Sequence, residues 1–125
     1  MNDTLSILAS LAGEEYCYLT TIGRVSGKPH EIEIWFGAQA GSMYLMAGDH
    51  GSDWVRNLRK DPGVTVRIAR HLFIGAARLV DNEQEEMTAR NMLADKYKER
   101  ETDGSLSEWA RTALVVRIDL EMLQA

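Results

Sequence analysis

The sequence predicts one α+β domain over residues 1–125, in which six mainly antiparallel strands close into a small barrel. A chain of 125 residues is long enough to form one hydrophobic core without cross-links. The periodicity of its apolar residues predicts the order helix, three strands, short helix, two strands, helix, strand. Because a long helix separates only one pair of consecutive strands, a doubly wound parallel sheet is disfavoured.

The first third of the chain is predicted to form one helix and three strands. The segment "NDTLSILASLAGEE" is typical of a short amphipathic helix, with Asp3 or Thr4 as its cap. The segment "HEIEIWF" alternates as a strand does, and "GAQAGS" after it is expected to be a turn. The three strands are expected at residues 16–22, 30–36 and 43–47.

The rest of the chain supplies the remaining three strands and two helices. The short helix is capped by Ser52 and ends before Pro62, and the long helix opens at Asn82 with Glu85 close to a capping box. The segment "SLSE" at 105–108 predicts the start of a brief helical turn. We expect helices at 53–61 and 82–100, and strands at 64–69, 72–80 and 112–120. The core faces of the strands carry Ile32, Ile34, Val64, Val66, Ile68, Leu114, Val116 and Ile118.

Composition and charge exclude several classes of function. An apolar content of 45% and a charged content of 26% are those of an ordinary soluble domain. A net charge of −5 disfavours nucleic acid or an anionic membrane as a partner. Neither a membrane-spanning segment nor a signal peptide is recognisable. The single cysteine, Cys17, excludes an internal disulfide and favours a cytoplasmic protein.

The segment "GRVSGKP" at 23–29 joins two predicted strands with more residues than a hairpin needs. Gly23 and Gly27 permit unusual backbone angles, and Arg24, Ser26 and Lys28 offer donors suited to phosphate or carboxylate. Residues 23–70 carry seven basic and five acidic side chains and form the only positive third of the chain. The alternative is a solvated hairpin loop, and the glycine spacing fits neither a P-loop nor a dinucleotide fingerprint.

A second segment, "AGDHGSDWVRNL", runs from a glycine-rich turn into a helix N-terminus. Such a turn presents free N–H groups, and Gly48 and Gly51 would let a flat ring lie against backbone. Asp53 in the first helical turn would repel a bare phosphate, so the polar edge of a heterocycle fits better. Trp54 and Asn57 offer packing and hydrogen bonding, respectively.

The remaining reactive side chains show no pattern of a catalytic or metal site. His30, His50 and His71 lack ligand spacing, so no metal is expected. Glu31 and Glu33 share one strand face, where solvent-facing charges are a simpler interpretation than an acid–base pair, and Cys17 is expected to be a small buried hydrophobe. Tyr97 on the long helix could donate a proton to a substrate, or it could only close the edge of the core.

Two stretches, "LTTIGRVSGKP" and "MYLMAGDHGSDWVRNLRKDPGVTVRI", together resemble the deazaflavin (coenzyme F420)-dependent nitroreductase and quinone reductase family. The resemblance covers residues 18–68 well and the rest in element order. It implies a split β-barrel related to FMN-binding proteins. Arg24, Ser26 and Lys28 would meet the acidic tail of the cofactor, the 48–52 turn would lie along the deazaflavin ring, and Trp54 and Asn57 would brace that turn. The implied cofactor-binding set is Gly23, Arg24, Ser26, Gly27, Lys28, Pro29, Ala47, Gly48, Gly51, Ser52, Trp54 and Asn57.

The resemblance implies an oxidoreductase in which reduced F420 supplies a hydride to a flat electron-poor acceptor such as a quinone, enone or nitro compound. Tyr97 lies where relatives often place a substrate-side tyrosine. The chain departs from the family pattern at Glu33, where many members have a proline, and at Asp49, where a basic residue is common. The alternatives are an FMN-binding split-barrel reductase and a carrier of an apolar ligand. A homodimer is expected, with outward Trp35 suited to its interface.

Overall fold

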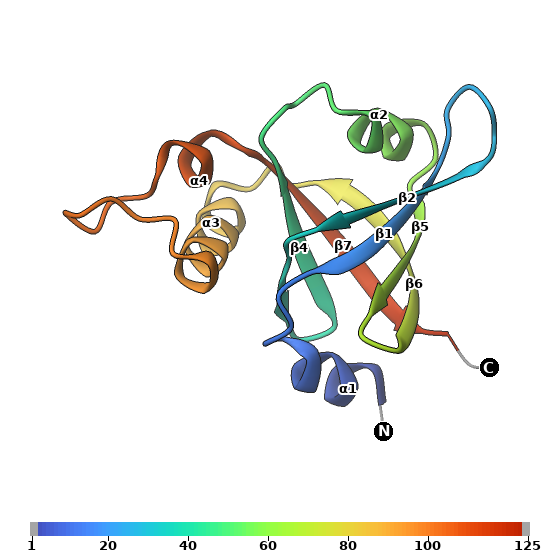
Figure 1. Cartoon of the computed structure of the whole chain (residues 1–125), viewed down its shortest axis with the longest axis horizontal. Coiled ribbons are helices and arrows are strands. Elements are labelled where there is room, and N and C mark those ends of the chain that lie inside the picture. Colours follow the sequence, from blue (N-terminus) through green and yellow to red (C-terminus); the bar gives the residue numbers. More distant parts are fainter. Residues whose placement is uncertain (1–2, 124–125) are drawn as a thin grey trace.

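The computed structural model describes residues 3–123 and confirms an α+β domain built on a curled antiparallel sheet (Figure 1). Within these residues it contains four helices and seven strands. The helices are α1 (Asp3–Leu11), α2 (Asp53–Lys60), α3 (Glu83–Tyr97) and α4 (Glu108–Thr112). The strands are β1 (Cys17–Ile22), β2 (Pro29–Ile34), β3 (Gly37–Gln39), β4 (Ser42–Ala47), β5 (Gly63–Ile68), β6 (His71–Leu79) and β7 (Leu114–Met122).

The strands lie in the order β2-β1-β5-β6-β7-β4-β3, and each neighbouring pair is antiparallel. Hairpins join β1 to β2, β3 to β4 and β5 to β6, but β1 also pairs with β5, and β7 lies between β6 and β4. The order is therefore not that of a simple meander. The nine-residue β7 holds the two halves together, since it pairs along both of its edges. The short strands β2 and β3 form the two edges of the sheet.

The predicted count of six strands is one too low, because β3 lies in a segment expected to be a turn. Only Gly37–Gln39 are extended, which is too short for an alternating pattern to reveal. The turn itself is confined to Ala40 and Gly41, and Ala40 adopts a left-handed conformation with φ of 55°. Met92 of α3 lies so close to Gly37 that a Cβ there would stand 2.6 Å from its Sδ. Gly37 therefore allows the long helix to approach the sheet.

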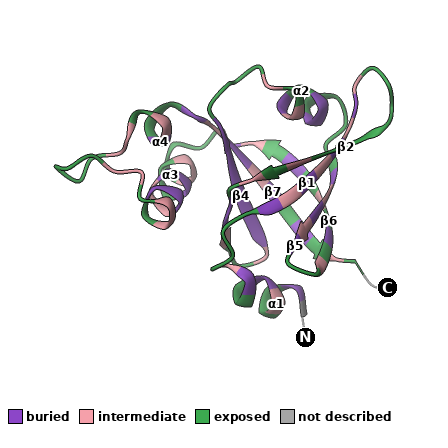
Figure 2. Ribbon diagram, viewed as in Figure 1, coloured by how far each residue is buried: buried purple, intermediate pink, exposed green. Residues whose placement is uncertain are grey.

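The core fills the concave side of the sheet, where purple segments of several strands face one another in Figure 2. Most residues assigned to the core are buried, including Val66 and Ile118. Ile32, Ile34 and Leu114 are only partly buried, since β2 is an edge strand and Leu114 begins β7. A second apolar cluster lies between the sheet, α3 and α4. Cys17 is fully buried, and burial raises the pKa of its thiol to about 12, as expected for a small core residue.

The predicted cap positions agree with the structure at α2, where Ser52 is the cap residue without a side-chain cap hydrogen bond, and at α3, and they differ at α1 and α4. Asn82 Oδ1 accepts the N–H of Glu85 at 2.8 Å, which confirms the predicted cap of α3. The predicted start of α4 at 105–108 is two residues early, because Ser107 is the cap and accepts the N–H of Ala110. The cap predicted at Asp3 or Thr4 falls inside α1, and the position before that helix lies outside the described residues.

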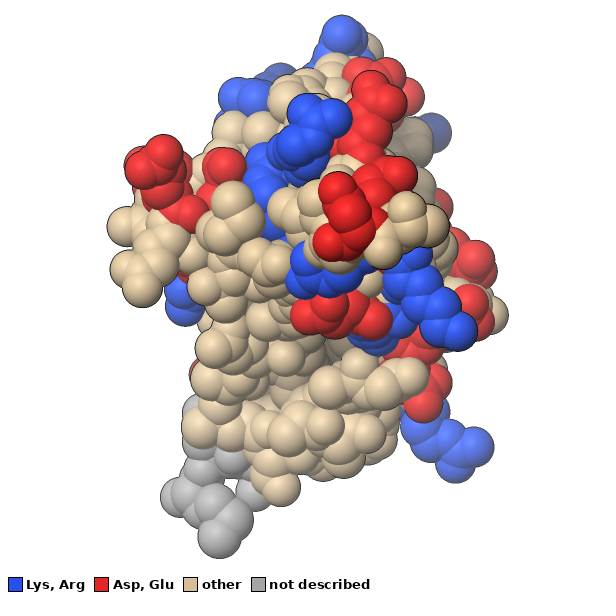
Figure 3. Space-filling view, turned by 90° about the vertical axis from the view of Figure 1, so that its left-hand side faces the viewer, with Lys and Arg blue, Asp and Glu red and all other residues tan. Residues whose placement is uncertain are grey.

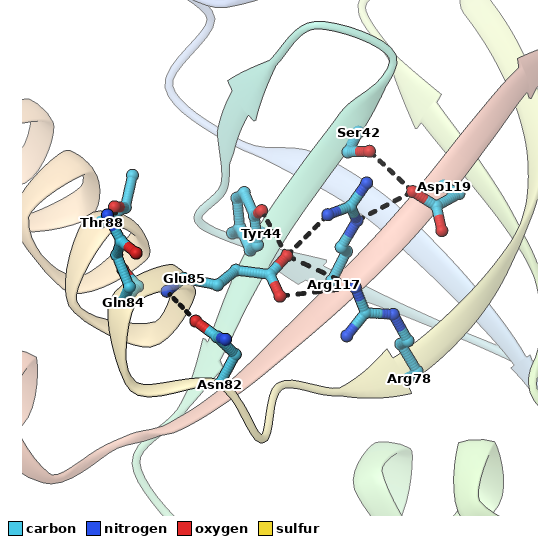
Figure 4. A network of polar contacts seen from close by, with 9 residues as sticks. All are labelled: Ser42, Tyr44, Arg78, Asn82, Gln84, Glu85, Thr88, Arg117 and Asp119. Atoms are coloured by element: carbon cyan, nitrogen blue, oxygen red, sulfur yellow. Dashed lines mark hydrogen bonds and ion pairs between the residues drawn. The ribbon is translucent and has the colours of Figure 1, made fainter.

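A polar network fixes the start of α3 to the sheet (Figure 4). Glu85 accepts hydrogen bonds from Arg117 at 2.6 Å and from the Tyr44 hydroxyl at 2.7 Å. These contacts lower the pKa of the Glu85 carboxyl, with the Arg117 hydrogen bond as the largest cause. Arg117 also contacts Asp119 at 2.8 Å, and Ser42 donates to Asp119 at 2.7 Å. With its first turn held this way, α3 places its last turn against the end of β2 and the start of β3.

Candidate functional site

The loop between β1 and β2 and the helix α2 lie side by side, joined by a cluster of hydrogen bonds. The backbone N–H of Arg24 and its Nη1 donate to Asn57 Oδ1 at 3.1 and 2.9 Å. Arg24 Nη2 also pairs with Asp53 at 3.1 Å, and Lys60 Nζ donates to the Arg24 carbonyl at 2.8 Å. The structure thus brings together the two segments that the sequence singled out, although they are about 30 residues apart in the chain.

Asn57 is the centre of this junction. Its side chain is nearly buried, with 4% of its surface exposed, and its Nδ2 donates to the Thr21 hydroxyl at 3.1 Å. Burial of a polar amide is tolerated because both of its ends are hydrogen-bonded. The residue therefore braces the 23–28 loop, whereas the family resemblance placed its contacts at the 48–52 turn.

A hollow of about 470 Å³, here called the α2 pocket, lies between this loop, α2 and the beginning of β2. Five residues of the predicted cofactor set line it, from both segments. Its lining consists of Thr21, Gly23, Arg24, Val25, Ser26, His30, Glu31, Ile32, Asp53, Trp54 and Asn57. Gly23 leaves room here for two side chains, since a Cβ would stand 2.7 Å from both His30 Nε2 and the Ser26 hydroxyl and would displace them.

The loop and α2, which border the α2 pocket, are rich in basic side chains, although the lining itself holds Arg24 beside the carboxylates of Glu31 and Asp53. The loop carries Arg24 and Lys28, and α2 carries three more basic residues, against Asp53 within the helix. Lys28 is exposed and forms no ion pair with the described residues, whereas Arg24 is already held by Asn57 and Asp53. An anionic group would therefore meet Lys28 directly and would compete with Asp53 for the Arg24 guanidinium. Pro29 follows this loop as the exposed first residue of β2.

The turn between β4 and α2 is the second part of the site. Ala47 ends β4 and is buried, whereas Gly48 and Gly51 are exposed. The turn is fixed internally because Asp49 accepts the N–H of Gly51 at 2.8 Å. It is also tied to the end of α4, since His50 Nε2 donates to the Thr112 carbonyl at 2.9 Å.

The residues of this turn and of the loop fit a flat, anionic cofactor. The Ser52 hydroxyl is buried and has no hydrogen-bond partner among the described residues, although Ser52 occupies the cap position of α2. The first N–H groups of α2 also lack intrahelical partners, as at every helix start. Gly48 and Gly51 carry no side chains at their two positions in the turn, and the basic residues of the loop and α2 supply donors for an acidic tail.

A second hollow, here called the aromatic pocket, lies at the other end of β2 and measures about 530 Å³. It is lined by Tyr16, Glu33, Ile34, Trp35, Met46, Glu99 and Trp109. It adjoins the turn, because a Cβ on Gly48 would stand 3.3 Å from Trp109 Cδ1. The α2 pocket uses residues 30–32 of the edge strand and the aromatic pocket residues 33–35, so the two pockets lie along one strand.

Trp35 and Tyr97 stack against each other with ring centroids 4.2 Å apart and planes 2° apart, and Trp109 meets Trp35 edge-on at 5.5 Å. The Tyr97 hydroxyl accepts the Phe36 N–H at 2.9 Å and donates to the Glu15 carbonyl at 2.6 Å. Burial raises the pKa of Tyr97 to about 12. These contacts favour a role in holding Trp35 over a role in donating a proton.

Lys96 lies beside this stack and is expected to make stability depend on pH. Its Nζ donates to the Phe36 carbonyl at 2.8 Å, and burial lowers its pKa to about 8. Between about pH 8 and 10 the unfolded chain binds more protons at this lysine than the folded chain does, so this lysine makes stability rise with pH there. The raised pKa of Cys17 acts in the opposite direction in the same window.

The measurement is urea denaturation from pH 7 to 10 in a Cys17→Ala background, with and without Lys96→Met. We expect the free energy of unfolding to rise more with pH when Lys96 is present than when it is replaced, because the raised pKa of Tyr97 acts in both proteins alike. Parallel curves for the two proteins would contradict this assignment.

Sequence reasoning missed much of the aromatic pocket. Trp35 was expected at a dimer interface, and neither Trp109, Tyr16 nor Glu99 was singled out. These residues come from four separate segments of the chain, so no spacing could reveal them. The sequence did offer one signal for this pocket, namely its tryptophans. The chain has three tryptophans, and two of them line the pocket.

The largest hollow lies elsewhere and contains none of the predicted site residues. It measures about 1250 Å³ and is lined mainly by the outer faces of β5, β6 and β7. Among residues 3–123, no three His, Cys, Asp or Glu side chains are grouped so that they could hold a metal ion. No helix in the described part of the chain combines the length and apolar character needed to cross a membrane. On the face seen in Figure 3, acidic and basic side chains intermix over the upper part, and the lower part is mostly uncharged.

The curled sheet is a known fold, because it occurs in solved structures of other proteins. An F420 reductase superimposes with a TM-score of 0.63 at 16% identity, covering 92% of each chain. An F420-H2 dependent reductase superimposes with a TM-score of 0.65 at 18% identity, covering 83% of this chain and 93% of the other. The heme storage protein HutZ from Vibrio cholerae gives 0.67 at 16% identity, over all of this chain and 93% of the other.

The chain belongs to the F420H(2)-dependent quinone reductase family, whose model matches residues 2–119. Among curated proteins, none matches the sequence. The family membership confirms the resemblance seen in the sequence and identifies the protein as an oxidoreductase with coenzyme F420 as its cofactor. It decides against the two alternatives, an FMN-dependent reductase and a non-catalytic carrier.

Proposed function

We propose that the protein reduces a flat, electron-poor acceptor such as a quinone, enone or nitro compound, with F420 held along β2. When bound in its reduced form, the cofactor supplies the hydride. The observation that carries this proposal is the polarity of the two pockets. The loop and α2 beside the α2 pocket carry five basic side chains, one of which, Arg24, lines the pocket together with Glu31 and Asp53, whereas the aromatic pocket is lined by aromatic rings and two carboxylates with no basic residue. An acidic tail is therefore attracted to the loop and α2, which leaves the turn for the ring.

Each part of the chain has a task in this proposal. Lys28, Arg24 and the buried hydroxyl of Ser52 bind polar groups of the cofactor. The backbone of 47–51 lies against its ring, where Gly48 and Gly51 present no side chain. Trp54 and Asn57 hold the α2 side of the site in place. The aromatic pocket receives the acceptor and orients it beside the turn.

Proton supply needs no catalytic acid in this account. A quinone that gains a hydride also gains one proton to become a hydroquinone, and the open aromatic pocket lets solvent provide it. Tyr97 as a proton donor stays a prediction, and the contacts of its hydroxyl favour a positioning role through Trp35.

The proposal is tested by mixing the protein anaerobically with reduced F420 and a naphthoquinone, and by following the return of the absorbance of oxidised F420. We expect protein-dependent oxidation that saturates with quinone. Oxidation no faster than without protein, for quinone, enone and nitro acceptors alike, would overturn it.

The homodimer and the cytoplasmic location stay predictions. Trp35, on which the interface was placed, gives part of its ring surface to Tyr97 and Trp109, although 37% of its surface remains exposed. Sedimentation of the purified protein at several concentrations measures whether two copies associate.

A further inference from the structure

The aromatic pocket combines two kinds of group that attract positive charge. Three aromatic side chains line it, and their ring faces carry negative quadrupole potential. Glu33 and Glu99 add two carboxylates, and no lysine, arginine or histidine is among the lining residues. A hollow of about 530 Å³ has room for a molecule of two or three fused rings.

Three basic side chains from segments beside this pocket are engaged in other contacts. Lys96 donates to the Phe36 carbonyl and lies over the Phe36 ring at 3.7 Å. Arg67 lies over the Tyr18 ring and pairs with Glu31. Arg100 is held by Asp95 and Asn91. The negative charge of the pocket is therefore left for a ligand to balance.

The Glu99 carboxylate is also held in place, and strand pairing fixes the backbone of Glu33. Glu99 Oε1 accepts a hydrogen bond from the Ser107 hydroxyl at 2.8 Å, and the Ser107 N–H donates to the Glu99 carbonyl. Glu33 is a ladder residue of β2, paired with Tyr18 of β1. Fixed carboxylates beside aromatic rings bind an organic cation better than mobile surface charges do, because less ordering is needed on binding.

We propose that the aromatic pocket selects acceptors whose flat ring carries a positive charge, such as N-alkylated heteroaromatic or iminium cations. This rests on the proposed function, since the pocket is the acceptor site of the same reaction. Such a cation gains a hydride at an electron-poor ring carbon, and the new C–H bond converts it to a neutral dihydro compound. The electron pair comes from the reduced cofactor of the family, and the proton left there goes to solvent. The neutral product is no longer attracted by Glu33 and Glu99, which favours its release.

The test is a binding experiment without F420, so that its outcome is independent of hydride transfer. N-methylquinolinium is compared with 2-methylquinoline, a neutral molecule of the same size, by fluorescence quenching in a Trp54→Phe background. In that background Trp35 and Trp109, both in the aromatic pocket, are the only tryptophans. We expect the cation to bind about tenfold more tightly than the neutral compound.

Two variants test whether the preference for the cation comes from the two carboxylates of the aromatic pocket. Glu33→Gln with Glu99→Gln is expected to reduce the ratio of affinities to about one. Glu83→Gln, which removes an exposed carboxylate in the first turn of α3 outside both pockets, is expected to leave it unchanged. Equal affinity for both probes in the parent, or a preference that survives the double change, would overturn the proposal. A protein that prefers the cation yet never oxidises F420H2 would instead refute the proposed function.

Discussion

Replacing Asn57 by alanine is expected to lower the free energy of unfolding by about 2–3 kcal/mol and to weaken F420 binding by about tenfold or more. The change removes the acceptor for two Arg24 donors and the donor to Thr21. The buried Thr21 hydroxyl and the Arg24 N–H would be left without these partners, and the 23–28 loop would lose its connection to α2. Urea denaturation and calorimetric titration with oxidised F420 measure the two effects.

Asn91→Ala provides a matched control for this prediction. Asn91 also makes two side-chain hydrogen bonds, but it lies on α3 and contacts Arg100 and the Met87 carbonyl. We expect it to cost about 1 kcal/mol or less and to leave F420 affinity unchanged. Equal losses of affinity in both variants would mean that general destabilisation, rather than the junction with the loop, determines binding.

The second large effect concerns the charges of the loop. Arg24→Ala combined with Lys28→Ala is expected to weaken F420 binding by at least tenfold and to make the remaining binding less sensitive to salt. Lys28→Ala alone is the cleaner change, because Lys28 is exposed and forms no ion pair with the described residues. The free energy of unfolding of the Lys28→Ala protein should therefore stay within about 0.5 kcal/mol of the parent value.

Lys98→Ala is the control for charge, since it removes an exposed lysine at the end of α3. Its F420 affinity and salt dependence should match those of the parent. Affinity that is unchanged in the Arg24→Ala/Lys28→Ala protein would remove the loop from the cofactor site.

Local sequence signals were sufficient for most elements and for the two segments of the site. The alternation in β2 and β5, the glycines around both turns, and the cap at Asn82 each act over a few residues, so they can be recognised without a structure. Contacts between the loop and α2 followed from their joint resemblance to one family. The hydrogen-bond partner of each side chain could not be predicted in this way. Asn57 was therefore expected to contact the 48–52 turn, whereas it contacts Arg24 of the 23–28 loop.

Features that depend on distant contacts could not be predicted. The three-residue β3 exists because β4 offers it an edge, and β7 joins two halves of the sheet through pairings that leave no periodic trace. The aromatic pocket arises only where β2, β4, α4 and the end of α3 converge. Outward Trp35 thus looked like a surface residue, although Tyr97 covers one of its faces.

The central claim is that the basic loop and α2 hold the tail of F420 while the turn and the aromatic pocket take its ring and the acceptor. The most direct test is calorimetric titration of the parent protein with oxidised F420 and with the same deazaflavin lacking the phosphate and glutamate tail, at low and high salt. We expect F420 to bind at least tenfold more tightly at low salt, with the difference shrinking as salt is added. Equal affinity for the two compounds at both salt concentrations would contradict the account.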